Sequence, residues 1–119
     1  MRHAEDKLHA EIVRALEVIL PPSVVWWSSE SRGVGVREGA RRKARGVKAG
    51  VPDMQFHFDS RSHFIEIKTT QGRMNEAQIA MAAWLRGAGH QYDVCRSLDD
   101  VIDCLRRAGC PMRIARIAA

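Results

Sequence analysis

The fold is decided by one stretch of the chain, VPDMQFHFDSRSHFIEIKT, which spans residues 51–69. In its first half Met54, Phe56 and Phe58 share one face of an extended chain, while Gln55 and His57 share the other. This alternation of apolar and polar residues predicts a β-strand with one buried face. Residues 59–62 predict a hairpin turn, so this strand should pair with the one that follows.

Residues 63–69 predict that second strand of the hairpin. Glu66 and Lys68 are two residues apart and project from one face, whereas Ile65 and Ile67 project from the other. Asp53 opens the preceding strand, so hairpin pairing should bring it beside the far end of this strand. The sequence therefore predicts two carboxylates and a lysine close together.

Two carboxylates that meet in this way form a hard oxygen site of the kind that suits Mg²⁺ or Mn²⁺. A neighbouring lysine can hold a water molecule or stabilise charge on a phosphate. The alternative is that Asp53 lies in a plain turn and that Glu66 and Lys68 lie on a solvated strand face. That alternative would be favoured for an isolated pair, but the apolar opposite face and the upstream sequence GVPD favour the site.

The rest of the chain supplies helices and two further strands. Apolar residues recur at helical spacing from residue 4 to 20, and Pro21-Pro22 ends that helix. Ser97 is a predicted N-cap, with Asp99 and Asp100 in the first helical turn that follows. We expect helices at 4–20, 75–86 and 98–107, and further strands at 24–27 and 92–96. The order α-β-β-β-α-β-α predicts an α/β fold, with helices flanking a mixed sheet.

Composition limits the classes of protein that the chain can belong to. Its 119 residues, 45% of them hydrophobic, predict one domain over residues 1–119 with a modest core. No apolar run approaches the length of a membrane span, and the N-terminus does not resemble a secretory signal. We therefore expect a cytoplasmic protein of a bacterial or phage-infected cell. The net charge of +5 favours a polyanionic partner.

Basic residues concentrate in one glycine-rich segment, residues 32–48. Four glycines interrupt it, which predicts a mobile loop. The loop is either merely solvated or a phosphate-binding element, and its charge alone does not separate the two interpretations. Its candidate DNA-binding residues are Arg37, Arg41, Arg42, Lys43, Arg45 and Lys48. Arg32 opens the segment but is not among these candidates.

Aromatic and sulfur-containing residues give weaker signals. Trp26 and Trp27 could stack on an unpaired base, but we expect both in the core. Three cysteines lack paired spacing and are expected to be ordinary buried thiols rather than zinc ligands: Cys95, Cys104 and Cys110.

Three motifs together resemble the VRR-NUC family of the PD-(D/E)XK nuclease superfamily. They are GVKAGVPD (46–53), FIEIK (64–68) and GRMNEAQ (72–78), and the resemblance extends from the first helix to about Asp100. It implies a restriction-endonuclease-like core and Mg²⁺- or Mn²⁺-dependent hydrolysis of phosphodiesters. The basic segment between Trp27 and Gly46 matches no family motif closely.

The resemblance also assigns roles to residues. Asp53 and Glu66 match the metal-binding acids, and the backbone carbonyl of Ile67 matches a further metal ligand. Lys68 matches the catalytic lysine, and Gln78 the glutamine that follows it in this family. Members carry an acid in the first helix, for which Glu5 is our candidate metal ligand, because it shares the inward stripe of that helix and could reach the metal from there; the alternative is an ordinary surface glutamate.

The resulting hypothesis is an endonuclease that cuts branched DNA, since small stand-alone relatives resemble dimeric Holliday junction resolvases. A twofold homodimer would most simply cut two strands. One alternative is a nuclease of the same fold that acts on flaps or duplex ends. Others are a DNA-binding module without catalysis and a basic RNA-binding protein, which would leave the acids and lysine unexplained.

Overall fold

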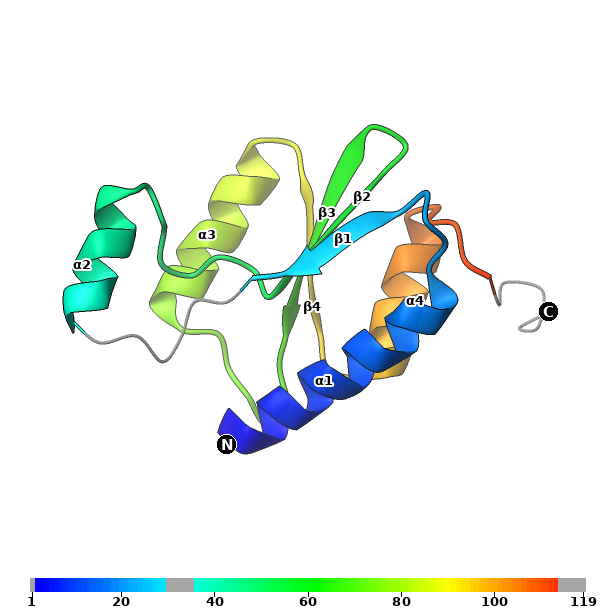
Figure 1. Ribbon diagram of the computed structural model, residues 1–119, viewed down its shortest axis with the longest axis horizontal. Helices are drawn as coiled ribbons and strands as arrows, with labels where there is room; N and C mark the ends of the chain where they lie inside the picture. Colours follow the sequence, from blue (N-terminus) through cyan, green and yellow to red (C-terminus); the bar gives the residue numbers. More distant parts are fainter. Residues whose placement is uncertain (1, 30–35, 114–119) are drawn as a thin grey trace.

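The computed structural model describes residues 2–29 and 36–113, apart from the side chains of residues 2 and 36–38 (Figure 1). Within these ranges no helix is both long and apolar enough to cross a membrane. Its elements, in chain order, are α1 (Arg2–Ile19), β1 (Val25–Ser28), α2 (Val36–Ala44), β2 (Met54–Phe58), β3 (Arg61–Ile67), α3 (Glu76–Gly87), β4 (Gln91–Cys95) and α4 (Leu98–Arg107).

The strands form one mixed sheet in the order β1-β2-β3-β4. The first three are antiparallel neighbours, and β4 runs parallel to β3. Asp59 and Ser60 make the β2–β3 turn with φ of 51° and 59°, the left-handed conformation of a tight hairpin. Gln55 lies opposite Phe64 and Met54 opposite Ile65, so the two strands bury the same face. The predicted hairpin and mixed sheet are thus confirmed.

Helices α1 and α4 pack together and cover one face of the sheet (Figure 1). They cover it because each carries an apolar stripe: Ile12 and Leu16 in α1, and Val101 and Leu105 in α4, are fully buried. These side chains meet Phe56 and the other inward residues of the hairpin in the main core. The Ser97 side chain accepts a hydrogen bond from the N–H of Asp100, so the predicted cap of α4 is present.

Helix α3 lies on the other side of the sheet and contacts β4 (Figure 1). Its buried residues are Met81 and Ala82. Glu66 belongs to this face because it alternates with the core residues Ile65 and Ile67. The Glu66 side chain therefore projects toward the side of the sheet on which α3 lies, at the end of the hairpin that also carries Asp53.

Helix α2 corrects the expectation of a mobile loop. Its sequence, VREGARRKA, consists mostly of good helix formers and contains only one glycine, Gly39. Gly46 has φ of 88° and donates its N–H to the carbonyl of Lys43, which ends the helix. Three cations in the last turn also favour the helix through its dipole. Most of the glycines thus flank the helix rather than interrupt it.

Candidate active site

Asp53 is held between three strands. It directly precedes β2, and its backbone carbonyl accepts a 2.8 Å hydrogen bond from the N–H of Ser29, just past β1. Its Oδ2 accepts a 2.8 Å hydrogen bond from the backbone N–H of Ile67. Both backbone groups of a residue in an extended strand lie on the same side of the strand, so the Ile67 carbonyl is directed toward the Asp53 side as well.

Glu66 is almost fully buried, with an exposed fraction of 1%. Its Oε2 accepts a 2.9 Å hydrogen bond from Nε2 of Gln78 in α3. Its Oε1 is buried and has no hydrogen-bond partner among the described atoms. A buried carboxylate oxygen without a partner is costly, so this atom is chemically suited to a cation.

Burial and the charge of Asp53 raise the pKa of Glu66 to about 8, despite the opposing effect of Lys68. Desolvation disfavours the charged carboxylate, and a second carboxylate nearby adds repulsion. A divalent cation between the two acids would remove that repulsion and satisfy the free oxygen. The donor set of Asp53, Glu66 and the Ile67 carbonyl consists entirely of oxygen, which fits Mg²⁺ or Mn²⁺.

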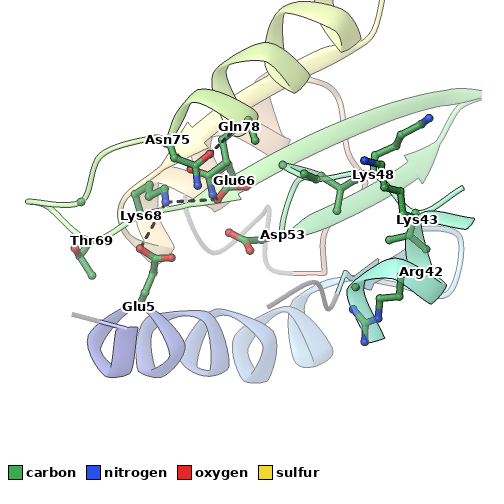
Figure 2. A pocket seen from close by; sticks show the side chains of 17 residues that line it. Glu5, Arg42, Lys43, Lys48, Asp53, Glu66, Lys68, Thr69, Asn75 and Gln78 are labelled. Atoms are coloured by element: carbon green, nitrogen blue, oxygen red, sulfur yellow. Dashed lines mark hydrogen bonds and ion pairs between the residues drawn. The ribbon is translucent and has the colours of Figure 1, made fainter. Parts of the chain in front are cut away.

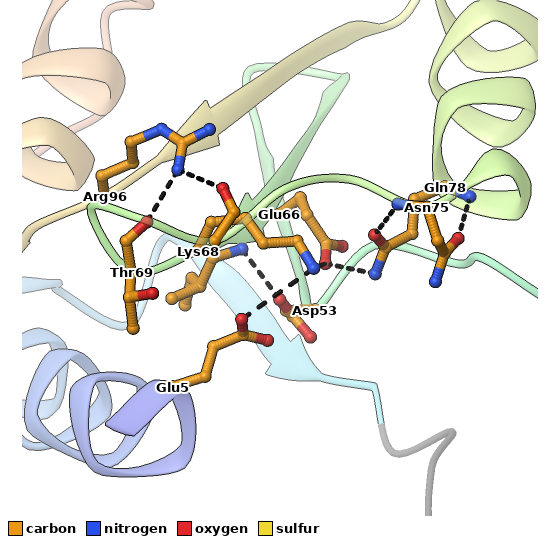
Figure 3. Close-up of polar contacts among 10 residues, drawn as sticks. Glu5, Asp53, Glu66, Lys68, Thr69, Asn75, Gln78 and Arg96 are labelled. Atoms are coloured by element: carbon orange, nitrogen blue, oxygen red, sulfur yellow. Dashed lines mark hydrogen bonds and ion pairs between the residues drawn. The ribbon is translucent and has the colours of Figure 1, made fainter. Parts of the chain in front are cut away.

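Lys68 places its Nζ 3.8 Å from Oε2 of Glu66 and 3.9 Å from Oε2 of Glu5 (Figure 3). Its backbone N–H donates to the carbonyl of Cys95, which extends the β3–β4 pairing by one residue beyond the strand. The Lys68 side chain is 9% exposed and that of Glu5 is 19% exposed. The buried ammonium thus lies between two acidic side chains, one from the sheet and one from α1.

Gln78 connects α3 to the site through both ends of its amide. While its Nε2 donates to Glu66, its Oε1 accepts from the N–H of Asn75 at 2.9 Å. Asn75 in turn accepts from the N–H of Gln78, which makes a capping box. The structure thus gives the Gln78 amide two polar partners, one of them the Glu66 carboxyl group.

Two further contributors were missed at the level of sequence. The Arg96 guanidinium donates 2.7 Å hydrogen bonds to the carbonyls of Thr69 and Gly72, which holds the loop after Lys68 (Figure 3). Gly50 has φ of 78°, and a Cβ there would lie 2.3 Å from the carbonyl oxygen of Ala77. Only glycine lets this loop approach α3 so closely. The GVPD motif offered a signal for Gly50, but Arg96 had none because its contacts are distant in sequence.

A cavity of about 730 Å³ joins these groups (Figure 2). Its lining includes Glu5, Asp53, Glu66, Lys68 and Gln78. Figure 2 shows the basic side chains across the cavity from Glu5 and Lys68. Of the predicted DNA-binding residues, those that line it are Arg42, Lys43 and Lys48.

The other predicted basic residues lie elsewhere. Arg41 and Arg45 are exposed and outside the cavity lining, and Arg37 belongs to α2 with its side chain outside the described part of the chain. Arg32 also lies outside the described residues.

The two tryptophans separate, contrary to the expectation that both are core residues. Trp26 packs against the core and stacks on Phe56. Trp27 points to the opposite face, is 46% exposed and stacks on His57 with ring centroids 4.8 Å apart. The prediction was wrong for Trp27 because neither α1 nor α4 covers its face of β1.

Comparisons with known proteins identify the family and the fold of the chain. The family model described as VRR-NUC domain matches residues 5–99, which include the three motifs and Glu5. A solved structure titled "VRR_NUC domain protein" superposes with a TM-score of 0.69 at 23% identity, covering 87% of this chain and 85% of that one. A search of curated proteins finds no match. The chain therefore belongs to the VRR-NUC domain family and has its nuclease-type fold.

Proposed function

We propose that this chain is a Mg²⁺- or Mn²⁺-dependent endonuclease that hydrolyses phosphodiester bonds of branched DNA and works as a homodimer. The observation that carries the nuclease proposal is the convergence of Asp53, Glu66 and Lys68 in one cavity whose far wall is basic. A protein that only binds DNA gains nothing from carboxylates near phosphates. Branched-DNA selectivity and the dimer rest on the family resemblance and on the need to cut two strands.

In this proposal Asp53, Glu66 and the Ile67 carbonyl hold the metal, and Glu5, whose Oε2 is 3.9 Å from Nζ of Lys68, is a further candidate ligand. When bound, the ion supplies Lewis acidity toward the phosphodiester and toward water. Gln78 fixes the rotamer of Glu66 through its 2.9 Å hydrogen bond. Glu66 must lose its proton to serve as a ligand, so metal binding should strengthen as the pH rises toward 8.

Lys68 orients the attacking water and stabilises negative charge that develops on the phosphate. Its ammonium is already fixed by Glu5 and Glu66, so little reorganisation is needed during reaction. Arg42, Lys43 and Lys48 then hold the DNA backbone across the cavity, as contacts to phosphate without reading of bases.

The test is cleavage of a labelled four-way junction, flap, linear duplex and single strand with Mg²⁺ or Mn²⁺. Chelator and Lys68→Ala are the controls. Metal-dependent cutting that Lys68→Ala abolishes is the expected result, with the junction cut fastest. Faster cutting of flaps or duplex ends would replace the branched-DNA part of the proposal. Tight binding without cutting of any substrate would replace the nuclease by a DNA-binding module.

A further inference from the structure

A second polar cluster lies on the face of the sheet that α1 and α4 cover, away from the cavity of the candidate active site. It consists of His63 in β3, Asp93 in β4 and Cys104 in α4. Nε2 of His63 is 2.9 Å from Oδ2 of Asp93 and 3.2 Å from Sγ of Cys104. Sγ of Cys104 is 3.1 Å from the same Asp93 oxygen. One nitrogen, one sulfur and one oxygen thus form a nearly equilateral triangle.

The fold brings these three atoms together from distant parts of the chain. His63 shares its face of β3 with Ile65 and Ile67, and Asp93 shares its face of β4 with Cys95, so both face α4. Cys104 lies on the buried face of α4 beside Val101 and Leu105. His63 and Cys104 are 3% and 4% exposed, whereas the Asp93 side chain is 43% exposed. The cluster is therefore built from inside the core and opens to solvent only past Asp93.

We propose that His63, Asp93 and Cys104 bind a transition-metal ion of the Zn²⁺ type. Imidazole nitrogen, thiolate and carboxylate are the ligands that tetrahedral zinc takes in proteins. Bond lengths of such sites imply ligand separations of about 3.4–3.6 Å, so the triangle would open by only a few tenths of an ångström. One thiolate and one carboxylate would balance the charge of the ion, with the thiol proton released to solvent.

Room for a fourth ligand is present at the same place. His63, Asp93 and Cys104 line a surface depression of about 370 Å³ with Gln91 and Arg107. A water molecule could complete a tetrahedron from that side. The other ring nitrogen of His63, Nδ1, is buried without a partner among the described atoms, so the polar contacts of the ring are concentrated at Nε2. No residue of this cluster lines the larger cavity, and the site is separate from the proposed nuclease chemistry.

The test is titration of the chelator-stripped full chain with Co²⁺ alone, followed by competition with Zn²⁺. A thiolate ligand gives a near-ultraviolet charge-transfer band, and tetrahedral coordination gives intense visible bands. We expect both bands at one equivalent, and their loss when Zn²⁺ displaces Co²⁺. Cys104→Ser should abolish the charge-transfer band, and Asp93→Asn should weaken binding at least tenfold. Because Asp93 is half-exposed, the latter variant should keep the fold.

Two controls make the result specific. Cys110→Ser removes a buried thiol outside the cluster and should leave both bands unchanged. Asp53→Asn disables the candidate active site, whose ligands are all oxygens, and should also leave the charge-transfer band. A stripped chain that shows no such band, or a band that survives Cys104→Ser, would overturn the proposal and leave a hydrogen-bonded cluster alone. Neither result bears on DNA cleavage.

Discussion

The two faces of strand β3 carry two polar clusters of different chemistry. On one face Glu66 meets Asp53, Gln78 and Lys68 in an open cavity that a basic wall completes. On the other face His63 meets Asp93 and Cys104 under α4, in contact with the main core. The first cluster offers carboxylate oxygens, one of which is buried without a partner among the described atoms, and the second offers a mixed nitrogen, sulfur and oxygen set.

The two environments differ in size and in the ligands that they suit. The cavity of about 730 Å³ is lined by Lys68 on one side and by Arg42, Lys43 and Lys48 on the other, as the proposed DNA substrate would require. The depression beside α4 is smaller and offers three convergent ligand atoms but little room for a polymer. The alternation of one strand thus separates a proposed reaction centre from a proposed metal site, although His63 and Glu66 are only three residues apart.

Matched substitutions of Asp53 and Asp93 should give the largest difference between the two faces of β3. Asp53→Asn removes a proposed metal ligand and should lower the rate of junction cleavage by about 10³-fold or more. Asp93→Asn makes the same chemical change on the other face and should leave cleavage within about twofold. Single-turnover cleavage at saturating Mn²⁺ measures both. Equal losses in the two variants would mean that the faces are coupled.

Gly50 and Gly46 have similar backbone conformations. Substituting each of them distinguishes the cost of a steric collision from the cost of backbone strain alone. Gly50→Ala should cost about 2–4 kcal/mol, since its Cβ would collide with the Ala77 carbonyl. Gly46 has φ of 88°, but a Cβ there would meet no atom within 4 Å. Gly46→Ala should therefore cost only about 1 kcal/mol. Urea unfolding gives both values. If Gly50→Ala were no worse than Gly46→Ala, the loop before Asp53 would not depend on its approach to α3.

The basic wall should affect DNA binding rather than chemistry. Lys43→Ala with Lys48→Ala should weaken junction binding about tenfold and reduce the slope of log K against log salt by about 2. The matched control, Arg106→Ala with Arg107→Ala, removes the same charge from α4. Binding titrations over a range of salt concentrations compare them. A similar loss in the control would show that net charge, and not the cavity wall, sets the affinity.

A further prediction concerns pH in the absence of metal. Burial and the charge of Asp53 raise the pKa of Glu66 to about 8 in the folded chain, whereas its ordinary value is 4.5. Stability should therefore fall as the pH rises between these values. Glu66→Gln should flatten that dependence, as should saturating Mn²⁺ in the unsubstituted chain. Thermal unfolding between pH 5 and pH 8.5, with chelator present, checks this, and a rise in stability over that range would contradict the assignment.

Much of the fold was predictable because local patterns report it directly. Alternation in residues 54–67 gives the hairpin and the faces of Glu66 and Lys68. The Ser97 cap and the acidic first turn give α4, and the three family motifs indicate the VRR-NUC fold that the comparisons confirm. The roles of Asp53, Glu66, Lys68, Gln78 and Glu5 remain predictions, although one cavity brings them together.

Other features depended on tertiary contacts. Helix α2 was hidden because glycines at its borders looked like interruptions of it. Trp27 was misplaced because sequence alternation says that two faces differ but not which helices cover them. The orphaned Glu66 oxygen and the raised pKa of that residue follow from the packing around it, which no local pattern encodes.

Sequence alone therefore determined which residues share a face, since strand and helix periodicity is a local property of the chain. Only the tertiary structure decided which faces meet. His63 joins Asp93 and Cys104 across separations of 30 and 41 residues, and Arg96 reaches the loop after Lys68 from the end of another strand. Such meetings depend on how whole elements pack, because the burial of apolar stripes, not local propensity, sets the position of each helix on the sheet.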